Sequence, residues 1–171
     1  MDARCQRVQG VANEPHLSKG TAVKAYRFFA YLIAVEVVVQ AAAIAFGVFG
    51  ESKFIDDGGT VDKALVDAKD TGVFTGAPGY AIHSINGTMV IPLLALILLI
   101  IAFFAKVPGG AKAAGIVLLL VVVQVALGIT AHAAPWLGPL HGINAFGVFV
   151  MAILAGKRAS TGVPAEPVVA A

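Results

Sequence analysis

Charge and cysteine are both scarce in this chain. Only 13% of its 171 residues are charged, and Cys5 is its one cysteine. A single thiol excludes an internal disulfide and a metal site built on several thiolates. No cluster of Lys and Arg is interleaved with aromatic residues, so nucleic acid is excluded as a partner. No glycine-rich loop follows a strand-like segment, which excludes a nucleotide site of that kind.

Apolar residues, in contrast, are abundant and come in long runs. They make up 58% of the chain, and the mean hydropathy is +0.87. A helix of about 20 apolar residues crosses a bilayer, and four runs reach that length, at about 25–48, 79–105, 112–133 and 139–156. Buried helices of a soluble protein are the alternative, but too little polar surface remains for one. The runs predict an all-α membrane protein with one transmembrane domain, residues 25–156, in the plasma membrane of a bacterium.

Lysine and arginine set the expected orientation. They precede the first run, flank the short turn between the second and third, and follow the fourth. Cytoplasmic loops carry this excess, so both the N-terminal tail (1–24) and the C-terminal tail (157–171) are predicted to be cytoplasmic. The outer loop, 49–78, holds six acids against three lysines. Helical spacing of apolar residues in "TVDKALVDAKD" indicates either a short amphipathic helix on the outer surface or an ordered loop without a partner.

A short phrase occurs twice in the chain. "HSINGTMV" stands at 83–90 and "HGINAFGV" at 141–148, while "VVVQ" stands at 37–40 and again at 121–124. Each half of the domain therefore reads as a helical hairpin with Gln in its first helix and His in its second. Parallel repeats of this kind are related by an axis along the membrane normal. The pattern predicts a four-helix bundle of two repeated hairpins, with His83 and His141 facing each other near the outer surface.

Each of these histidines stands one helical turn before a small residue. Residues i and i+4 share a helix face, so His83 lies over Gly87 and His141 lies over Ala145. The small residues leave a flat gap in which a planar macrocycle fits, and two imidazoles can take both axial positions of a haem iron. We expect haem b with His83 and His141 as its iron ligands. The alternative is that these residues only join helices.

Three further polar residues belong to the expected site. Asn86 and Asn144 are costly in lipid, and they can hydrogen-bond around the rim of the haem or across to a neighbouring helix. His132, at the outer end of the third run, is a candidate ligand, a partner for the haem propionates, or a histidine at the water interface. The last two roles are favoured because the first run has no matching histidine. His16 lies in the N-terminal tail and has no expected role.

The segment "VVVQVALGITAHAAPWLGPLH" resembles the hairpins of haem A synthase. In that family Gln-x-x-x-Gly-x-x-Thr precedes an outer loop and a histidine-bearing helix. The matching positions are Gln124, Gly128, Thr130 (one residue closer) and His141. The resemblance covers about residues 25–156, or one four-helix half of the synthase, and implies a bundle holding haem near its outer face. The chain is also similar to small four-helix membrane proteins with a His-x-x-Asn-Gly motif.

The chain departs from the synthase around the first histidine. The family has an acid three residues before a ligand histidine and Arg after it, where this chain has Tyr80 and Ser84, and many synthases carry an outer cysteine pair. The resemblance therefore supports the haem site more than haem modification, which is the third candidate function. Whether the protein is an enzyme at all stays open.

Two function classes remain after these exclusions. The first is a b-type haem protein that transfers electrons near the outer face, with a quinone, a periplasmic donor or other subunits of a larger membrane oxidoreductase as partner. The second is a cofactor-free structural or assembly subunit of a respiratory complex. Glu36, near the middle of the first run, is expected to bond Gln124 or another helix, with a proton or quinone role as the alternative.

Overall fold

The structure is a computed structural model that describes residues 19–68, 70 and 72–161. Cys5, His16 and most of the two expected tails lie outside these residues. The described part of the chain is predominantly helical and has no strand. Its elements are α1 (Lys19–Asp56), α2 (Lys63–Ala68), α3 (Ala77–Ile85), the π-helical η1 (Asn86–Val90), α4 (Ile91–Ala105), α5 (Gly110–Ala131), the 3₁₀ turn η2 (Pro135–Leu137) and α6 (Gly138–Thr161).

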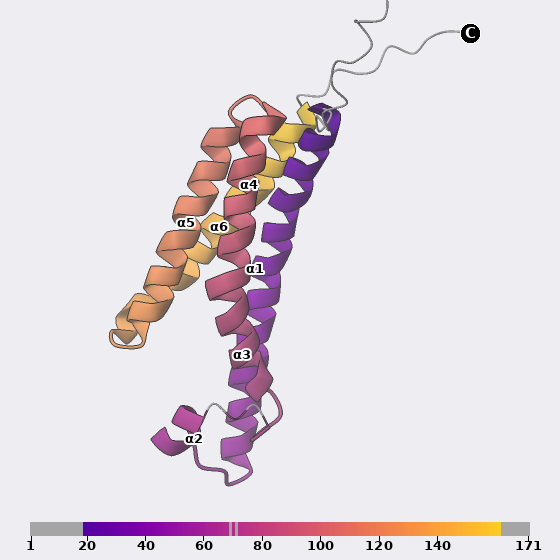
Figure 1. Ribbon diagram of the computed structural model, residues 1–171. Coiled ribbons are helices and arrows are strands. Elements are labelled where there is room, and N and C mark those ends of the chain that lie inside the picture. The colour runs from indigo at the N-terminus through magenta and orange to yellow at the C-terminus, as the bar shows by residue number, and fades with distance from the viewer. Residues whose placement is uncertain (1–18, 69, 71, 162–171) are drawn as a thin grey trace, which may run out of the picture.

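Four of the resulting rods are long and apolar enough to cross a membrane. They are α1, the continuous rod formed by α3, η1 and α4, then α5, and finally η2 with α6. In Figure 1 the rods lie side by side, with both ends of the described chain and the α4–α5 turn at one end of the bundle. Because α1 packs against α3, α4 and α6, and α5 against α4 and α6, the rods form a four-helix bundle. The prediction of an all-α protein with four spanning helices is confirmed, and a multi-pass membrane protein is supported.

The first helix is longer than its apolar run. It begins at Lys19 and ends at Asp56, 38 residues in all, which is roughly 57 Å at 1.5 Å per residue. A hydrocarbon core of about 30 Å covers little more than half of that length. The end of α1 extends beyond the α5–α6 turn, and Figure 1 shows it beside α2 and the start of α3.

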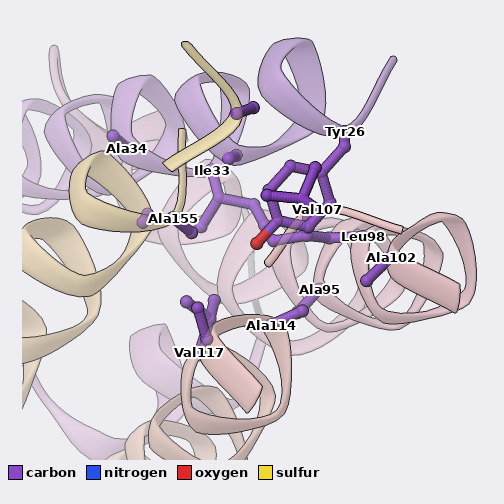
Figure 2. Close-up of a cluster of buried hydrophobic side chains, with 14 of the residues drawn as sticks. Tyr26, Ile33, Ala34, Ala95, Leu98, Ala102, Val107, Ala114, Val117 and Ala155 are labelled. Carbon is purple, nitrogen blue, oxygen red and sulfur yellow. The ribbon is translucent and has the colours of Figure 1, made fainter. Parts of the chain in front are cut away.

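Alanine dominates the core, which lies toward the end of the bundle where α1 begins and α6 ends. Most of the core cluster is alanine, contributed by α1, α4, α5 and α6, and Figure 2 shows Ala95, Ala114 and Ala155 pointing into it. Small side chains let membrane helices approach closely. The larger members include Tyr26, which is fully buried and whose hydroxyl donates to the carbonyl of Gly110 at 3.0 Å. The helices are therefore packed tightly at this end.

Glycine replaces alanine where α3 meets α1 at the other end. A Cβ on Gly79 would lie 2.4 Å from the carbonyl oxygen of Ala43, and a Cβ on Gly50 would lie 1.8 Å from that of Thr75. Gly76, with φ of +108°, makes the turn into α3, a conformation that favours glycine. The two backbones are thus in direct contact, and this contact fixes where α3 begins along α1.

The outer loop contains a helix at the place where the sequence indicated one. The backbone N–H of Leu65 donates to the carboxylate of Asp62 at 2.9 Å, so Asp62 caps α2. Phe54 of α1 stacks on Phe74 at 5.6 Å between ring centres. The hydroxyl of Tyr80 donates to the carboxylate of Glu51, and both contacts hold the end of the loop against α1.

The outward faces of the long helices are apolar. Leu93 on α4, Leu119 on α5 and Phe146 on α6 have more than half of their surface exposed, as do many of their neighbours. A soluble monomer rarely exposes apolar patches this extensive. Asn86 is the one buried polar side chain among the described residues. The apolar outward faces of the helices are suited to a lipid environment.

Candidate functional site

Two histidines from different helix pairs lie close together inside the bundle, at the end away from the alanine core. His83 lies on α3 and His141 lies near the start of α6. Their ring centres are 6.3 Å apart, and the ring planes are tilted by 59°. The two residues that the repeated phrase singled out are therefore brought together, each at the partly buried surface of its own helix.

Each imidazole is oriented by a backbone carbonyl of the neighbouring helix. Nδ1 of His83 lies 3.2 Å from the carbonyl oxygen of Gln40 on α1, and Nδ1 of His141 lies 3.1 Å from that of Gln124 on α5. A carbonyl oxygen can only accept, so both rings carry their hydrogen on Nδ1. Each Nε2 then keeps its lone pair, which is the arrangement usual for histidines that bind a metal through Nε2.

A closed hydrogen-bond network surrounds His141. The amide nitrogen of Gln124 lies 3.0 Å from Nε2 of His141 and 3.0 Å from its backbone oxygen. The amide nitrogen of Asn144 donates to Oε1 of Gln124 at 2.6 Å and to the carbonyl of Leu120 at 2.9 Å. A Cβ on Gly128 would lie 3.1 Å from the His141 ring, so the absence of a side chain there lets the ring lie against α5.

The corresponding network around His83 is incomplete. The amide nitrogen of Asn86 donates to the carboxylate of Glu36 at 2.9 Å, and so turns away from Gln40. Both side-chain polar atoms of Gln40, and Oδ1 of Asn86, are buried without a hydrogen-bond partner. Buried polar atoms nearly always have a partner in a protein or a bound molecule. This side of the site thus has hydrogen-bonding capacity that the described side chains do not use.

The backbone that carries Asn86 and Gly87 forms a π turn. Asn86–Val90 forms η1, and the N–H of Ile91 bonds back to the carbonyl of Asn86. Pro92, in the first turn of α4, lacks the N–H that an α-helical bond would need. Such turns inside α-helices often occur at functional sites. Here the extra residue places Asn86 and Gly87 on the face that meets α1.

A cavity of about 1330 Å³ opens around the two histidines. It exceeds the roughly 300–1,000 Å³ of an ordinary ligand site. Most of its lining is apolar side chains of α1, α5, α6 and the outer loop, and the polar or small residues that matter for the site are Gln40, His83, Gly87, Gln124, Gly128, His132, His141 and Ala145. The cavity is large, predominantly apolar and supplied with two imidazoles.

The predicted site residues gather here, with some roles changed. Gly87 and Ala145 line the cavity, although a Cβ on Gly87 would lie 3.0 Å from the Gln40 amide, which now covers part of the expected gap. Asn86 and Asn144 donate to neighbouring helices, the second of their two expected roles. His132 is exposed at the end of α5 and borders the cavity.

Sequence reasoning missed the pairing of Glu36 with Asn86, although it expected Glu36 to bond another helix. The signal was present in the repeat: four residues before each glutamine stand Glu36 and Leu120, and both positions accept from the asparagine of their own pair. Sequence reasoning also gave no role to Gly79. No group of three or more His, Cys, Asp or Glu side chains with metal-binding geometry occurs among the described residues, so two imidazoles are the candidate ligands.

Comparison with known proteins gives a family without an assigned function. The model of a family of unknown function, DUF6220, matches residues 71–134, from the end of the outer loop to the turn after α5. The match covers less than half of the chain and includes His83 but not His141. No curated protein and no solved structure matches the chain.

Proposed function

We propose that the protein is a membrane cytochrome of the b type, in which His83 and His141 hold one haem and the bundle passes electrons near its outer face. The carrying observation is the separation of 6.3 Å between the two ring centres. A metal–imidazole nitrogen bond is about 2 Å and each ring centre lies roughly 1 Å behind its nitrogen, so two axial imidazoles place their centres roughly 6 Å apart. The two rings already have this spacing.

The groups around the rings also fit a bound macrocycle. Both Nδ1 atoms are engaged by carbonyl oxygens, so Nε2 would be the ligand atom of each ring. On His141 the Gln124 amide, 3.0 Å from Nε2, would have to turn away to admit the iron. The Gln40 amide has no partner that holds it over Gly87, so it is free to rotate away from the gap. We assign His132, at the exposed border of the cavity, to the carboxylate edge of the haem. The chain has no Cys-x-x-Cys-His sequence, so attachment would be non-covalent, as in b-type haem.

The proposed ligation favours electron transfer over catalysis. An iron with two histidine ligands exchanges single electrons and has no open position for a substrate. The chain's own residues would fix the rings through the carbonyls of Gln40 and Gln124 and exclude water with apolar side chains of α1, α5 and α6. A quinone or a soluble donor of the outer compartment would supply the electron. Haem modification is not favoured, because Tyr80 occupies the position where the synthase has an acid, three residues before the histidine. The Tyr80 hydroxyl donates to Glu51.

A visible spectrum tests the haem proposal most directly. The protein purified in mild detergent should show a haem absorption band and a positive pyridine haemochrome assay. His83→Ala and His141→Ala should each lose at least nine-tenths of the haem, because one imidazole cannot supply both axial ligands, while His16→Ala should retain it. A colourless wild-type protein, or full haem retention in both site variants, would refute the proposal.

We further propose that the bundle consists of two repeated hairpins with both termini in the cytoplasm of a bacterium. The corresponding contacts of His83 with Gln40 and of His141 with Gln124 support the repeat. The orientation is supported by the distribution of charge: at one end of the bundle the start of α1, the α4–α5 turn and the end of α6 carry seven cations and no acid among the described residues, whereas the outer loop is acidic.

Cysteine labelling tests this orientation. Single cysteines placed at Asp57 or Asp62 in a Cys5→Ser background should react with a membrane-impermeant thiol reagent added to intact spheroplasts. A cysteine at Lys112, in the first turn of α5, should react only after the membrane is opened. The reverse pattern would show that the outer loop is cytoplasmic.

A cofactor-free structural subunit of a respiratory complex is the second candidate. The exposed apolar faces of the helices and the acidic outer loop would then serve to dock other subunits. The two functions are compatible, since a haem-binding subunit can belong to a larger oxidoreductase. The spectrum separates them: a colourless protein that copurifies with respiratory subunits would favour the structural function alone.

A further inference from the structure

One end of the bundle is strongly basic. The start of α1, the α4–α5 turn and the end of α6 lie together there (Figure 1). Among the described residues, these three segments contribute cations without any acid: Lys19, Lys24, Arg27, Lys106, Lys112, Lys157 and Arg158. In a bilayer this excess would lie near the phospholipid phosphates, and it attracts anions more strongly than a mixed surface would.

A groove on α1 begins at two of these cations. The groove is shallow and open, with a volume of about 410 Å³. All of its lining residues lie on one face of the helix: Lys24, Arg27, Phe28, Tyr31, Leu32 and Val35. The guanidinium of Arg27 lies 6.0 Å from the centre of the Tyr31 ring. That ring lies against α6, where a Cβ on Gly156 would lie 2.8 Å from it. The groove therefore has a basic head, a fixed aromatic wall and an apolar tail.

The length of the groove matches one leaflet. From Lys24 to Val35 is 11 residues, or roughly 16 Å at 1.5 Å per residue. Half of a hydrocarbon core of about 30 Å is roughly 15 Å. A molecule whose charged group lies between Lys24 and Arg27 would thus extend its apolar part along Leu32 to Val35 and end near the middle of the bilayer. Val35 has 56% of its surface exposed and is available to such a chain.

We propose that this groove binds an anionic phospholipid, with its phosphate between Lys24 and Arg27 and one acyl chain along Leu32 and Val35. The charge requirement selects an anionic headgroup over a zwitterionic one, and the apolar tail selects a lipid over a free phosphate. The site lies at the opposite end of the bundle from the histidines and does not depend on the proposed haem.

Native mass spectrometry of the full chain in mild detergent tests the proposal. The wild-type protein should retain phosphatidylglycerol and much less phosphatidylcholine with the same acyl chains. In Lys24→Gln/Arg27→Gln the apparent affinity for phosphatidylglycerol should fall roughly 25-fold, about fivefold for each cation. Lys106→Gln/Lys112→Gln removes the same charge from the same end outside the groove, and it should reduce the affinity less than threefold.

Three results would overturn the proposal. Equal retention of the two lipids would show no headgroup selection. An equal loss of affinity in the two double variants would show a diffuse charge effect instead of a site. Full competition by glycerol phosphate, which has the anionic group but no acyl chains, would show that the apolar tail of the groove contributes nothing.

Discussion

Gly79→Val is expected to lower the free energy of unfolding by about 3 kcal/mol or more and to remove the proposed haem together with the fold of α3. Gly79 has no space for a side chain, because its Cβ would lie 2.4 Å from the Ala43 carbonyl oxygen and 2.8 Å from the Gly47 nitrogen. These are backbone atoms of α1 and cannot rotate away. Overpacking usually costs about 1–3 kcal/mol, and a backbone clash falls at the upper end or above.

The displacement would reach the histidine. Moving α3 away from α1 breaks the contact of His83 with the Gln40 carbonyl and the bond of Tyr80 to Glu51. Denaturant titration in detergent gives the stability, and the spectrum of the proposed haem reports the site. Gly115→Val is the matched control, since nothing lies within 4 Å of a Cβ at Gly115. If the two variants were equally stable, the close contact between α1 and α3 would be wrong.

The two repeated glutamines are expected to respond in opposite directions to the same substitution. Gln124→Leu removes bonds to His141 and to Asn144. Hydrogen bonds inside membrane proteins average roughly 0.6 kcal/mol each, so the three together should cost about 2 kcal/mol. Gln40→Leu removes an amide whose polar atoms are buried without a partner. That change should be neutral or stabilising by up to about 1 kcal/mol, because an unsatisfied buried group carries a desolvation cost.

Both glutamine variants are measured by the same denaturant titration, each against the wild type. Gln40→Leu and Gln124→Leu are each other's control, since the substitution and the place in the repeat are identical. Equal losses of stability would contradict the difference between the two networks. They would mean that the Gln40 amide has a hydrogen-bond partner as strong as that of Gln124.

The sequence was informative wherever a property depends on periodicity or run length. The four apolar runs predicted four spanning helices, because a bilayer sets a minimum length that few soluble helices reach. The repeated phrase predicted that His83 and His141 face each other, because the same residue in two parallel hairpins lies at the same depth. In both cases a local pattern determines a long-range position through simple geometry.

Other features depend on which helix is the neighbour, and the sequence alone does not supply that. Gly79 reads as the first residue of the second apolar run until α1 is placed against it. The last two turns of α1 lie beyond its apolar run and are held by Phe54 on Phe74 and by Glu51 with Tyr80. The bond of Asn86 to Glu36 joins residues 50 positions apart. The π turn of η1 was likewise not predicted, although Pro92 follows it and lacks the N–H that an α-helical bond would need.

The alanine core has a mechanical consequence for the distant site. The alanine core joins the α1–α3 pair to the α5–α6 pair at one end. Beyond it the two pairs form free arms that act as levers, with His83 on one and His141 on the other. Ala30 and Gln40 are separated by 10 residues, or roughly 15 Å of helix, so a rotation of only about 4° at the alanine end moves the free arms apart by roughly 1 Å. Packed interiors respond to a single added methylene. The distance between the two imidazoles therefore depends on the volume of small side chains such as Ala95 and Ala114, which touch neither ring.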